Sequence, residues 1–244
     1  MSSSPQFLVS VRNANECEAA VFGGADIIDV KEPANGPLGM ADGRTLQAIR
    51  DRLTTLDTAA PFSIALGEIS DWFEGPALRR GADLLAEEIC HLNSEYLKLG
   101  LTGRAAWRED WAKVRELPFG RVTWVAVAYA DFSRCDAPSP EEVLAEGRKT
   151  GCGVLLIDTF RKDGSSLLDW MERDRMKRIQ IETSAAGMKL ALAGKVTTES
   201  LPDILEICPD IVAVRGAVCE QGRRERSVDQ CLVAGFRREL QAIR

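Results

Sequence analysis

The 244-residue sequence contains a single histidine, His91. A Ser-His-Asp or Cys-His triad would have to use that residue, and so would a histidine-rich metal site. His91 follows a stretch of helical spacing and lies away from every expected strand end, so we expect it at a helix end or on the surface. Any chemistry should therefore depend on Lys, Asp, Glu and Arg rather than on an imidazole.

Paired cysteines and nucleotide-binding loops are also missing. The seven cysteines are odd in number and no two have CxxC spacing, which argues against a disulfide framework and a structural zinc site. We expect most of them to be small apolar core residues in a reducing compartment. No GxGxxG or Walker A loop follows an early strand. The sequence predicts neither a metal nor an organic cofactor.

Long apolar runs are absent as well. No segment approaches the roughly 18 apolar residues of a membrane span, and residues 1–5 lack the basic and apolar regions of a signal peptide. The net charge of −6 opposes the wrapping of nucleic acid or binding to an anionic membrane. We expect a cytoplasmic protein whose partner is a small molecule, and the sequence leaves formation of a homo-oligomer open.

Hydrophobic residues (45%) and charged residues (28%) are present in the proportions of an ordinary globular protein. Short apolar, β-branched runs alternate with stretches of helical spacing. The expected strands are residues 7–11, 26–30, 62–66, 96–101, 122–128, 153–158, 189–192 and 211–214. The expected helices are residues 15–22, 44–53, 75–92, 104–117, 140–149, 166–186, 198–208 and 228–243. Eight such units in a chain of this length predict one α/β domain over residues 1–244, a single (β/α)8 TIM barrel, rather than an open doubly wound sheet.

Local signals support several of these boundaries. Ser139 before Pro140 and Thr198 before Glu199 are typical of helix starts. The glycines at 23 and 24 indicate a helix end and a turn into the second strand.

Charged residues gather where the expected strands end, which is where a barrel carries its active site. Asp29 and Lys31 are two residues apart in an extended run and so face the same side. Lys98 interrupts the apolar run of the fourth strand. Asp158 ends the sixth strand, and Lys162 follows it closely. We expect these five side chains to share one mouth of the barrel.

Such a cluster allows a limited chemistry. Neighbouring lysines repel one another and burial disfavours their charge, so both effects lower the pKa of one amine. A neutral lysine can form a Schiff base with a carbonyl substrate, while carboxylates move the protons. The turns after the last two strands would then bind phosphate through backbone N–H groups and a cation. The residues expected to do so are Gly194, Arg215, Gly216 and Ala217.

The order of several segments resembles a known family. These segments are Gly24-Ala-Asp-Ile-Ile-Asp-Val-Lys31, Gly36-Pro-Leu-Gly39, Tyr96-Leu-Lys-Leu-Gly-Leu101, Asp158-Thr-Phe-Arg-Lys-Asp-Gly164, Leu190-Ala-Leu-Ala-Gly194 and Val214-Arg-Gly-Ala-Val-Cys-Glu220. Together they resemble the (5-formylfuran-3-yl)methyl phosphate synthase family, also called 4-(hydroxymethyl)-2-furancarboxaldehyde-phosphate synthase. The resemblance runs from about Phe7 to about Arg223.

The resemblance implies a class I aldolase-like barrel. It also implies a lyase that joins two glyceraldehyde 3-phosphate molecules into the furan precursor of methanofuran, releasing phosphate and water, as part of one-carbon metabolism. Lys31 corresponds to the Schiff-base nucleophile of the family. The other matching positions are Asp29, Lys98, Asp158 and Lys162. The bulky Phe160 and Arg161 and the basic run 223–226 depart from the pattern, and we expect neither to touch the matched chemistry.

Two other interpretations stay open. A class I Schiff-base aldolase acting on another sugar phosphate would use the same lysines and make a simple aldol. A catalytically silent barrel would bind a phosphorylated metabolite, and its function would survive the change Lys31→Ala.

Overall fold

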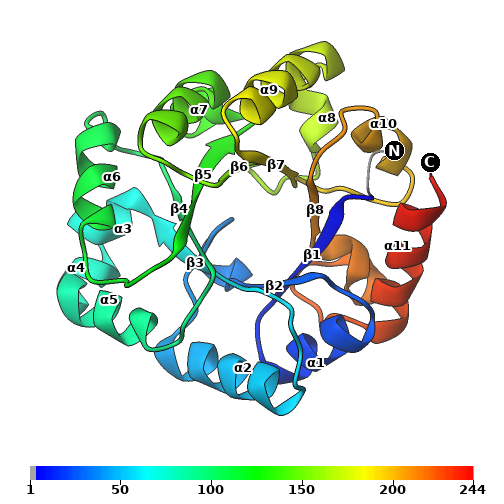
Figure 1. Ribbon diagram of the computed structural model, residues 1–244, viewed down its shortest axis with the longest axis horizontal. Coiled ribbons are helices and arrows are strands. Elements are labelled where there is room, and N and C mark those ends of the chain that lie inside the picture. Colours follow the sequence, from blue (N-terminus) through cyan, green and yellow to red (C-terminus); the bar gives the residue numbers. More distant parts are fainter. Residues whose placement is uncertain (1–3, 244) are drawn as a thin grey trace.

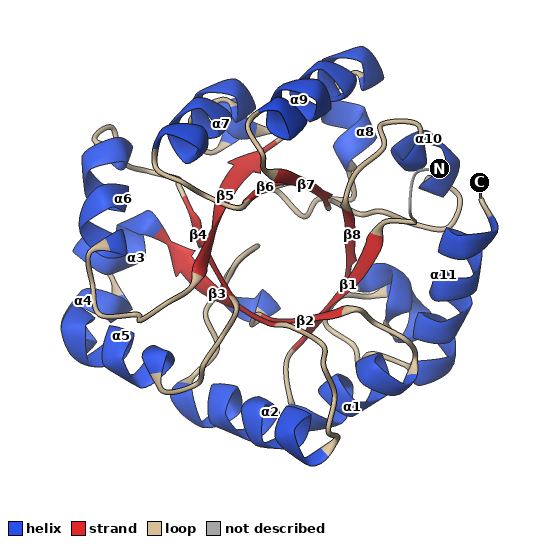
Figure 2. Cartoon of the chain, viewed as in Figure 1, coloured by secondary structure: helices blue, strands red, loops and turns tan. Residues whose placement is uncertain are grey.

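The strands of the computed structural model, which describes residues 4–243, form a closed parallel barrel in chain order. The predicted (β/α)8 fold is therefore confirmed. Figure 1 shows the strands inside a ring of helices, and Figure 2 shows the same alternation by element type. The strands are β1 (Gln6–Val11), β2 (Ile27–Val30), β3 (Phe62–Glu68), β4 (Tyr96–Gly100), β5 (Thr123–Tyr129), β6 (Val154–Asp158), β7 (Lys189–Leu192) and β8 (Ile211–Val214).

The helices differ in part from the expected ranges. They are α1 (Ala14–Phe22), α2 (Gly43–Thr55), α3 (Ile69–Phe73), α4 (Pro76–Arg80), α5 (Ala82–Cys90), α6 (Trp107–Arg115), α7 (Pro140–Lys149), α8 (Leu167–Trp170), α9 (Arg173–Ala185), α10 (Leu201–Leu205) and α11 (Gln230–Ala242). Short 3₁₀ turns are η1 (Pro33–Asn35), η2 (Phe132–Arg134), η3 (Gly216–Val218) and η4 (Glu220–Gly222).

Two of the expected long helices are in fact pairs. The stretch 75–92 is divided at Gly81, whose φ of 88° lies outside helical geometry. The stretch 166–186 is divided between α8 and α9, where Met171 is extended. Helical periodicity continued across both breaks and concealed them.

The helix starts were predicted with mixed success. Ser139 caps α7 in a capping box with Glu142, with Pro140 in the first turn, as expected. Thr198 does not cap a helix. The helix α10 begins at Leu201, with Ser200 at its N-cap, because Ser200 and Thr197 close a tight turn ahead of it.

The core has two layers, because each strand is buried on both faces. Outward-facing side chains such as Phe7 and Val9 pack against the helices. Inward-facing side chains form a second apolar cluster inside the barrel. Among these are Leu8, Ile27, Val125, Leu156 and Ile211. They also line the cavity described below, so they form its apolar wall beneath the polar groups at the strand ends.

Histidine and cysteine lie in unlike positions. His91 is exposed and ends α5, as predicted. The cysteines are all free, but just three of them, Cys17, Cys152 and Cys219, are buried, so the expectation that most are core residues is wrong. Of the other four, Cys90 and Cys135 are half-buried, and Cys208 and Cys231 are exposed.

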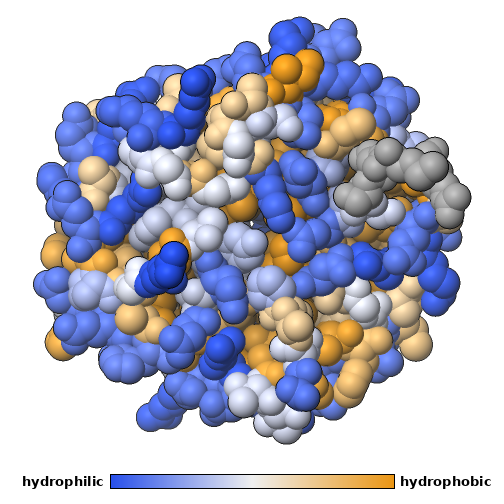
Figure 3. All heavy atoms as spheres, in the orientation of Figure 1, coloured by the Kyte–Doolittle hydropathy of each residue, from blue (hydrophilic) through white to orange (hydrophobic). Residues whose placement is uncertain are grey.

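The outer surface is mainly polar. In the space-filling view of Figure 3, hydrophilic residues cover most of the visible face and apolar residues form small separate areas. None of the helices within residues 4–243 is long and apolar enough to span a bilayer.

Candidate active site

A cavity of about 360 Å³ opens at the carboxyl ends of the strands and extends down into the barrel. Its volume is in the range of small-molecule sites. Four of the predicted catalytic residues line it: Lys31, Lys98, Asp158 and Lys162. Gly194, Arg215, Gly216 and Ala217 also line it. The structure thus brings the predicted residues to one mouth.

Asp29, the fifth predicted catalytic residue, lies fully buried on β2 beside this cavity. Its Oδ1 is 2.7 Å from Lys98 Nζ and accepts a 2.8 Å hydrogen bond from Ser63 Oγ. Its Oδ2 accepts a 2.8 Å hydrogen bond from Ser10 Oγ. Burial opposes ionisation, but Lys98 and Lys31 lower the pKa of Asp29 below its usual value. Asp29 is therefore a charged group with both oxygens engaged by the protein.

Lys31 directly follows β2, and its side chain is 8% exposed. Among the residues that the structure describes, its Nζ forms no hydrogen bond or ion pair. Burial, with help from Lys98 and Lys162 and against the attraction of Asp158 and Asp29, lowers the pKa of Lys31 to about 7. A substantial fraction of this amine is therefore neutral at physiological pH.

Asp158 and Lys162 form the second ion pair of the cavity. Lys162 Nζ lies 2.8 Å from Asp158 Oδ1 and donates a 3.2 Å hydrogen bond to Thr159 Oγ1. Burial again opposes ionisation, yet Lys162 and Lys31 lower the pKa of Asp158 to about 2. Unlike Asp29, this carboxylate lines the cavity. It is thus ionised and available to a substrate.

The turn after β7 is held open by glycine. Gly194 has a φ of 91°, and a Cβ there would lie 3.1 Å from Thr159 Cγ2 and 3.2 Å from Thr159 N. Within residues 4–243, no protein acceptor takes the N–H groups of Gly194, Gly216 or Ala217. The next residue, Lys195, donates through Nζ to the Gly164 carbonyl. This side of the mouth therefore presents unused N–H groups that can bind an anion.

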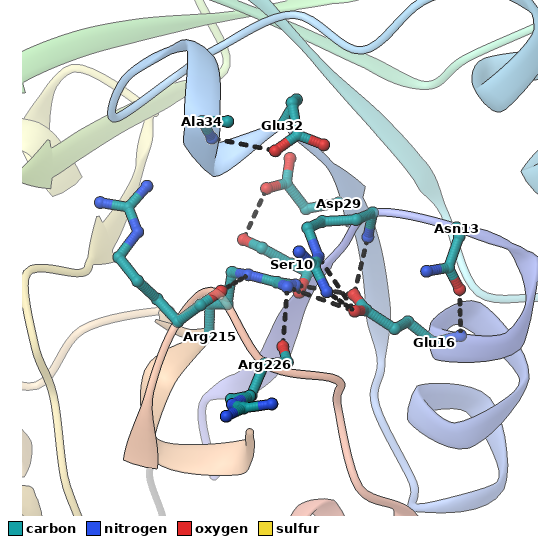
Figure 4. Close-up of polar contacts among 10 residues, drawn as sticks. Ser10, Asn13, Glu16, Asp29, Glu32, Ala34, Arg215 and Arg226 are labelled. Atoms are coloured by element: carbon teal, nitrogen blue, oxygen red, sulfur yellow. Dashed lines mark hydrogen bonds and ion pairs between the residues drawn. The ribbon is translucent and has the colours of Figure 1, made fainter. Parts of the chain in front are cut away.

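The expectation that the Arg215 side chain binds phosphate needs correction. Two of its nitrogens contact Glu16, with Nη1 2.8 Å from Oε2 and Nη2 3.3 Å from Oε1. The remaining donors bind the backbone carbonyls of Ser10, Arg224 and Arg226 at 2.8, 2.7 and 3.2 Å. Figure 4 shows Arg215 between Glu16 of α1 and Arg226. Its five N–H donors are thus used within the protein.

The sequence analysis missed polar groups that support the site. Ser10 and Ser63 lie inside strands, and only the paired barrel places them on Asp29. The basic run 223–226, which we expect not to touch the matched chemistry, contributes Arg223 and Arg224 to the lining of the cavity. The expectation that it does not touch the site is therefore wrong. The signal was its position directly after β8.

A buried polar cluster, which we call the Glu68 cluster (Glu68, Thr102 and Tyr129), was missed too. Tyr129 Oη donates to Glu68 Oε1 at 2.5 Å, and Thr102 Oγ1 donates to Oε2 at 2.9 Å. Burial raises the pKa of Glu68. The fully buried Leu38 belongs to the same inner apolar cluster as Tyr129, and its carbonyl accepts a hydrogen bond from the Gly67 N–H. Neither Glu68 nor Tyr129 lines the cavity, so these two side chains belong to the support of the barrel rather than to the wall of the cavity.

Comparison with known proteins identifies the family of the chain. The 4-HFC-P synthase family model matches residues 7–237. The (5-formylfuran-3-yl)methyl phosphate synthase of Methanococcus maripaludis strain S2 is 35% identical over 224 residues, covering 89% of this chain and 91% of that protein. The protein of the same name from Methanocaldococcus jannaschii is 33% identical over 234 residues, covering 93% and 95%.

A solved structure supports the fold alone. The 3-hexulose-6-phosphate synthase from Salmonella typhimurium superposes with a TM-score of 0.61 at 12% identity, over 98% of this chain and 97% of that one. The closed barrel and the charged cluster at its mouth define a (β/α)8-barrel enzyme. More particularly, the chain belongs to the 4-HFC-P synthase family, whose curated members are (5-formylfuran-3-yl)methyl phosphate synthases.

Proposed function

We propose that the protein condenses two glyceraldehyde 3-phosphate molecules into (5-formylfuran-3-yl)methyl phosphate, with loss of phosphate and water, for methanofuran-type cofactor biosynthesis. The family membership supports the product. The observation that carries the mechanism is Lys31, a buried amine that lines the cavity, is attracted by the charges of Asp158 and Asp29, and has a pKa of about 7.

In the first step, Lys31 Nζ attacks the carbonyl carbon of one triose phosphate. This carbon is the aldehyde carbon of glyceraldehyde 3-phosphate or the keto carbon of its ketone isomer. Loss of water gives an imine, which draws electrons from the neighbouring carbon. Only the neutral amine can attack, and desolvation of Nζ supplies it near neutral pH.

Proton transfers then fall to Asp158, because it is the carboxylate that reaches the cavity. It accepts the proton of the carbon beside the imine, which gives the enamine. The electron pair of the enamine expels phosphate from the next carbon of the imine-bound unit, and the unsaturated imine that results tautomerises to the imine of a 2-oxo aldehyde with a methyl end. The methyl carbon then loses a proton and bonds to the keto carbon of the second triose phosphate, which reacts as its ketone isomer and keeps its own phosphate. Ring closure, further loss of water and hydrolysis of the imine give the furan and return the Lys31 amine.

The remaining charges have supporting roles. Asp29 does not move protons in this scheme, because both of its oxygens are bonded to Lys98, Ser10 and Ser63. It fixes Lys98 and balances its charge. Lys162 holds Asp158 in place and compensates negative charge that develops in the cavity. The N–H groups of Gly194, Gly216 and Ala217 bind phosphate.

The test is incubation of the purified protein with glyceraldehyde 3-phosphate alone, followed by ultraviolet and mass analysis. We expect a furan chromophore with the product mass and release of inorganic phosphate, with the same yield after treatment with a chelator. Lys31→Ala serves as the control and should give neither signal. A simple aldol of higher mass without phosphate release would show an ordinary aldolase instead. Phosphate binding without any product would indicate a silent barrel.

A further inference from the structure

We propose that Arg224 binds the phosphate of the second triose phosphate, and that the buried Arg215–Glu16 pair is the device that positions it. This inference rests on the proposed function for the identity of the ligand. The position of Arg224 itself does not depend on which reaction the protein performs: it is a cation that reaches over the cavity from the loop after β8.

Arg224 reaches over the cavity mouth from one side toward the other. It lines the cavity together with Lys31 and Asp158, and its Nη2 donates a 3.3 Å hydrogen bond to the Gly36 carbonyl in the loop after β2. Burial lowers the pKa of Arg224, and Asp158 opposes this by attracting its charge. Within residues 4–243, the other N–H groups of this guanidinium have no protein acceptor. They are available to an anion in the cavity.

The loop that carries Arg224 is anchored from its base. Cys219 and Val228 form an antiparallel bridge, and the Glu220 N–H donates to the Ser227 carbonyl at 3.0 Å. Arg215 then binds this loop from inside, through the carbonyls of Arg224 and Arg226. The backbone of the loop is therefore held at Arg224 itself and two residues further along, at Arg226.

Glu16 explains why Arg215 can be buried there. Both are almost fully buried, and Arg12 adds a second cation to Glu16, with Nη2 at 3.0 Å from Oε1. A buried charge of this kind is tolerated only when it is paired and hydrogen-bonded. Since every N–H group of Arg215 is used in this network, Arg215 acts through Arg224, as a positioning residue. Figure 4 shows the network reaching from α1 to the loop.

Phosphate is the ligand that these groups fit. Two triose phosphates bring two phosphates, and the proposed function assigns one of them to the N–H groups after β7 and β8. A guanidinium presents pairs of N–H groups that match two phosphate oxygens, and Lys cannot reproduce that geometry. The structure thus assigns the second phosphate to Arg224.

The experiment is a titration of the intact protein with inorganic phosphate, followed by calorimetry, in parallel with KM and kcat for glyceraldehyde 3-phosphate. We expect the wild type to bind two phosphates per chain. In Arg224→Ala the affinity of one of these two sites should fall about 10-fold to 100-fold, which is the range for a charge-assisted hydrogen bond. Arg224→Lys should keep part of the affinity. KM should rise more than kcat falls.

Arg238→Ala is the matched control, because it removes the same charge from an exposed position on α11. It should bind two phosphates. Arg215→Lys alone should weaken the binding of phosphate to Arg224. Added to Arg224→Ala, the same change should not lower the phosphate affinity further, whereas a merely structural role of Arg215 would lower it in both backgrounds. Unchanged binding of both phosphates in Arg224→Ala and Arg224→Lys would overturn the proposal. Loss of one phosphate in a protein that makes no furan would refute the proposed function alone.

Discussion

The two halves of the barrel mouth are built in opposite ways. Over β2 to β5, polar groups are bonded to one another: Asp29 to Lys98, and Glu68 to Tyr129. Over β6 to β8, Asp158 and Lys162 also form a pair, but the glycine turns leave N–H groups unused and Arg224 reaches across the opening. We call these the closed half and the open half. Lys31 directly follows β2, at the edge of the closed half.

The difference separates two tasks that conflict. A reactive amine needs desolvation and fixed charges around it, which a closed set of side chains supplies. Phosphate needs donors that are still free, which a closed set cannot offer. Dividing the mouth allows both in one cavity of about 360 Å³. Changes in the closed half should therefore affect the chemical step or stability, and changes in the open half should affect substrate binding.

The largest effect should come from Lys31, at the edge of the closed half. Lys31→Ala removes the nucleophile, and Lys31→Arg keeps a charge that does not deprotonate, so neither can form the imine. We expect both to lose on the order of 10⁴-fold or more in kcat, because the covalent route is lost as a whole. Steady-state kinetics with furan detection measures this. Normal turnover by Lys31→Arg would show that the amine is not the nucleophile.

The pH profile should report the closed half. Because the pKa of Lys31 is about 7 and only the neutral amine reacts, kcat/KM should rise with pH up to about 7 and then level off. The charge of Lys98 helps to lower this pKa, and Lys98→Met removes it while Asp29 still attracts a proton to Lys31. The rising limb should therefore move to higher pH in Lys98→Met. A limb that stays in place would show that another group titrates.

Sequence alone could predict the strand order and the residues at the strand ends, because period and charge pattern carry that information. It could not predict which charges are satisfied. Asp29 and Asp158 look alike in sequence, but Ser10 and Ser63 come from neighbouring strands and bind only the first. In sequence, Arg215 resembles a phosphate ligand, but in the structure its guanidinium binds Glu16, which is 199 residues away in the chain. Such pairings depend on register and closure, which local patterns do not contain.

The open half should respond to a smaller change at its glycine turn. Gly194→Ala forces a side chain into the left-handed region and against Thr159, at a cost of about 1–2 kcal/mol. We expect KM for glyceraldehyde 3-phosphate to rise about tenfold with a smaller change in kcat. Gly187→Ala is the control, since it has a φ of 71°, no atom within 4 Å of its Cβ and a position in the turn before β7. If KM rose equally in both variants, the change would come from a general loss of protein stability rather than from the turn that binds phosphate.

The smallest effect on turnover should come from the Glu68 cluster. Tyr129→Phe leaves Glu68 Oε1 without its 2.5 Å donor in a buried place. The free energy of unfolding should fall by about 1–3 kcal/mol while kcat stays near that of the wild type. Denaturant unfolding and kinetics on the same preparation test this. A large loss of kcat with unchanged stability would place Tyr129 in the chemistry instead.

The central claim is that the Lys31 amine at the edge of the closed half forms the covalent intermediate. Borohydride reduction in the presence of glyceraldehyde 3-phosphate, followed by peptide mass mapping, tests it most directly. We expect a reduced three-carbon adduct on Lys31, its absence in Lys31→Arg, and its retention at lower yield in Lys162→Ala. An adduct on Lys98 or Lys162, or no adduct in a protein that turns over, would contradict it.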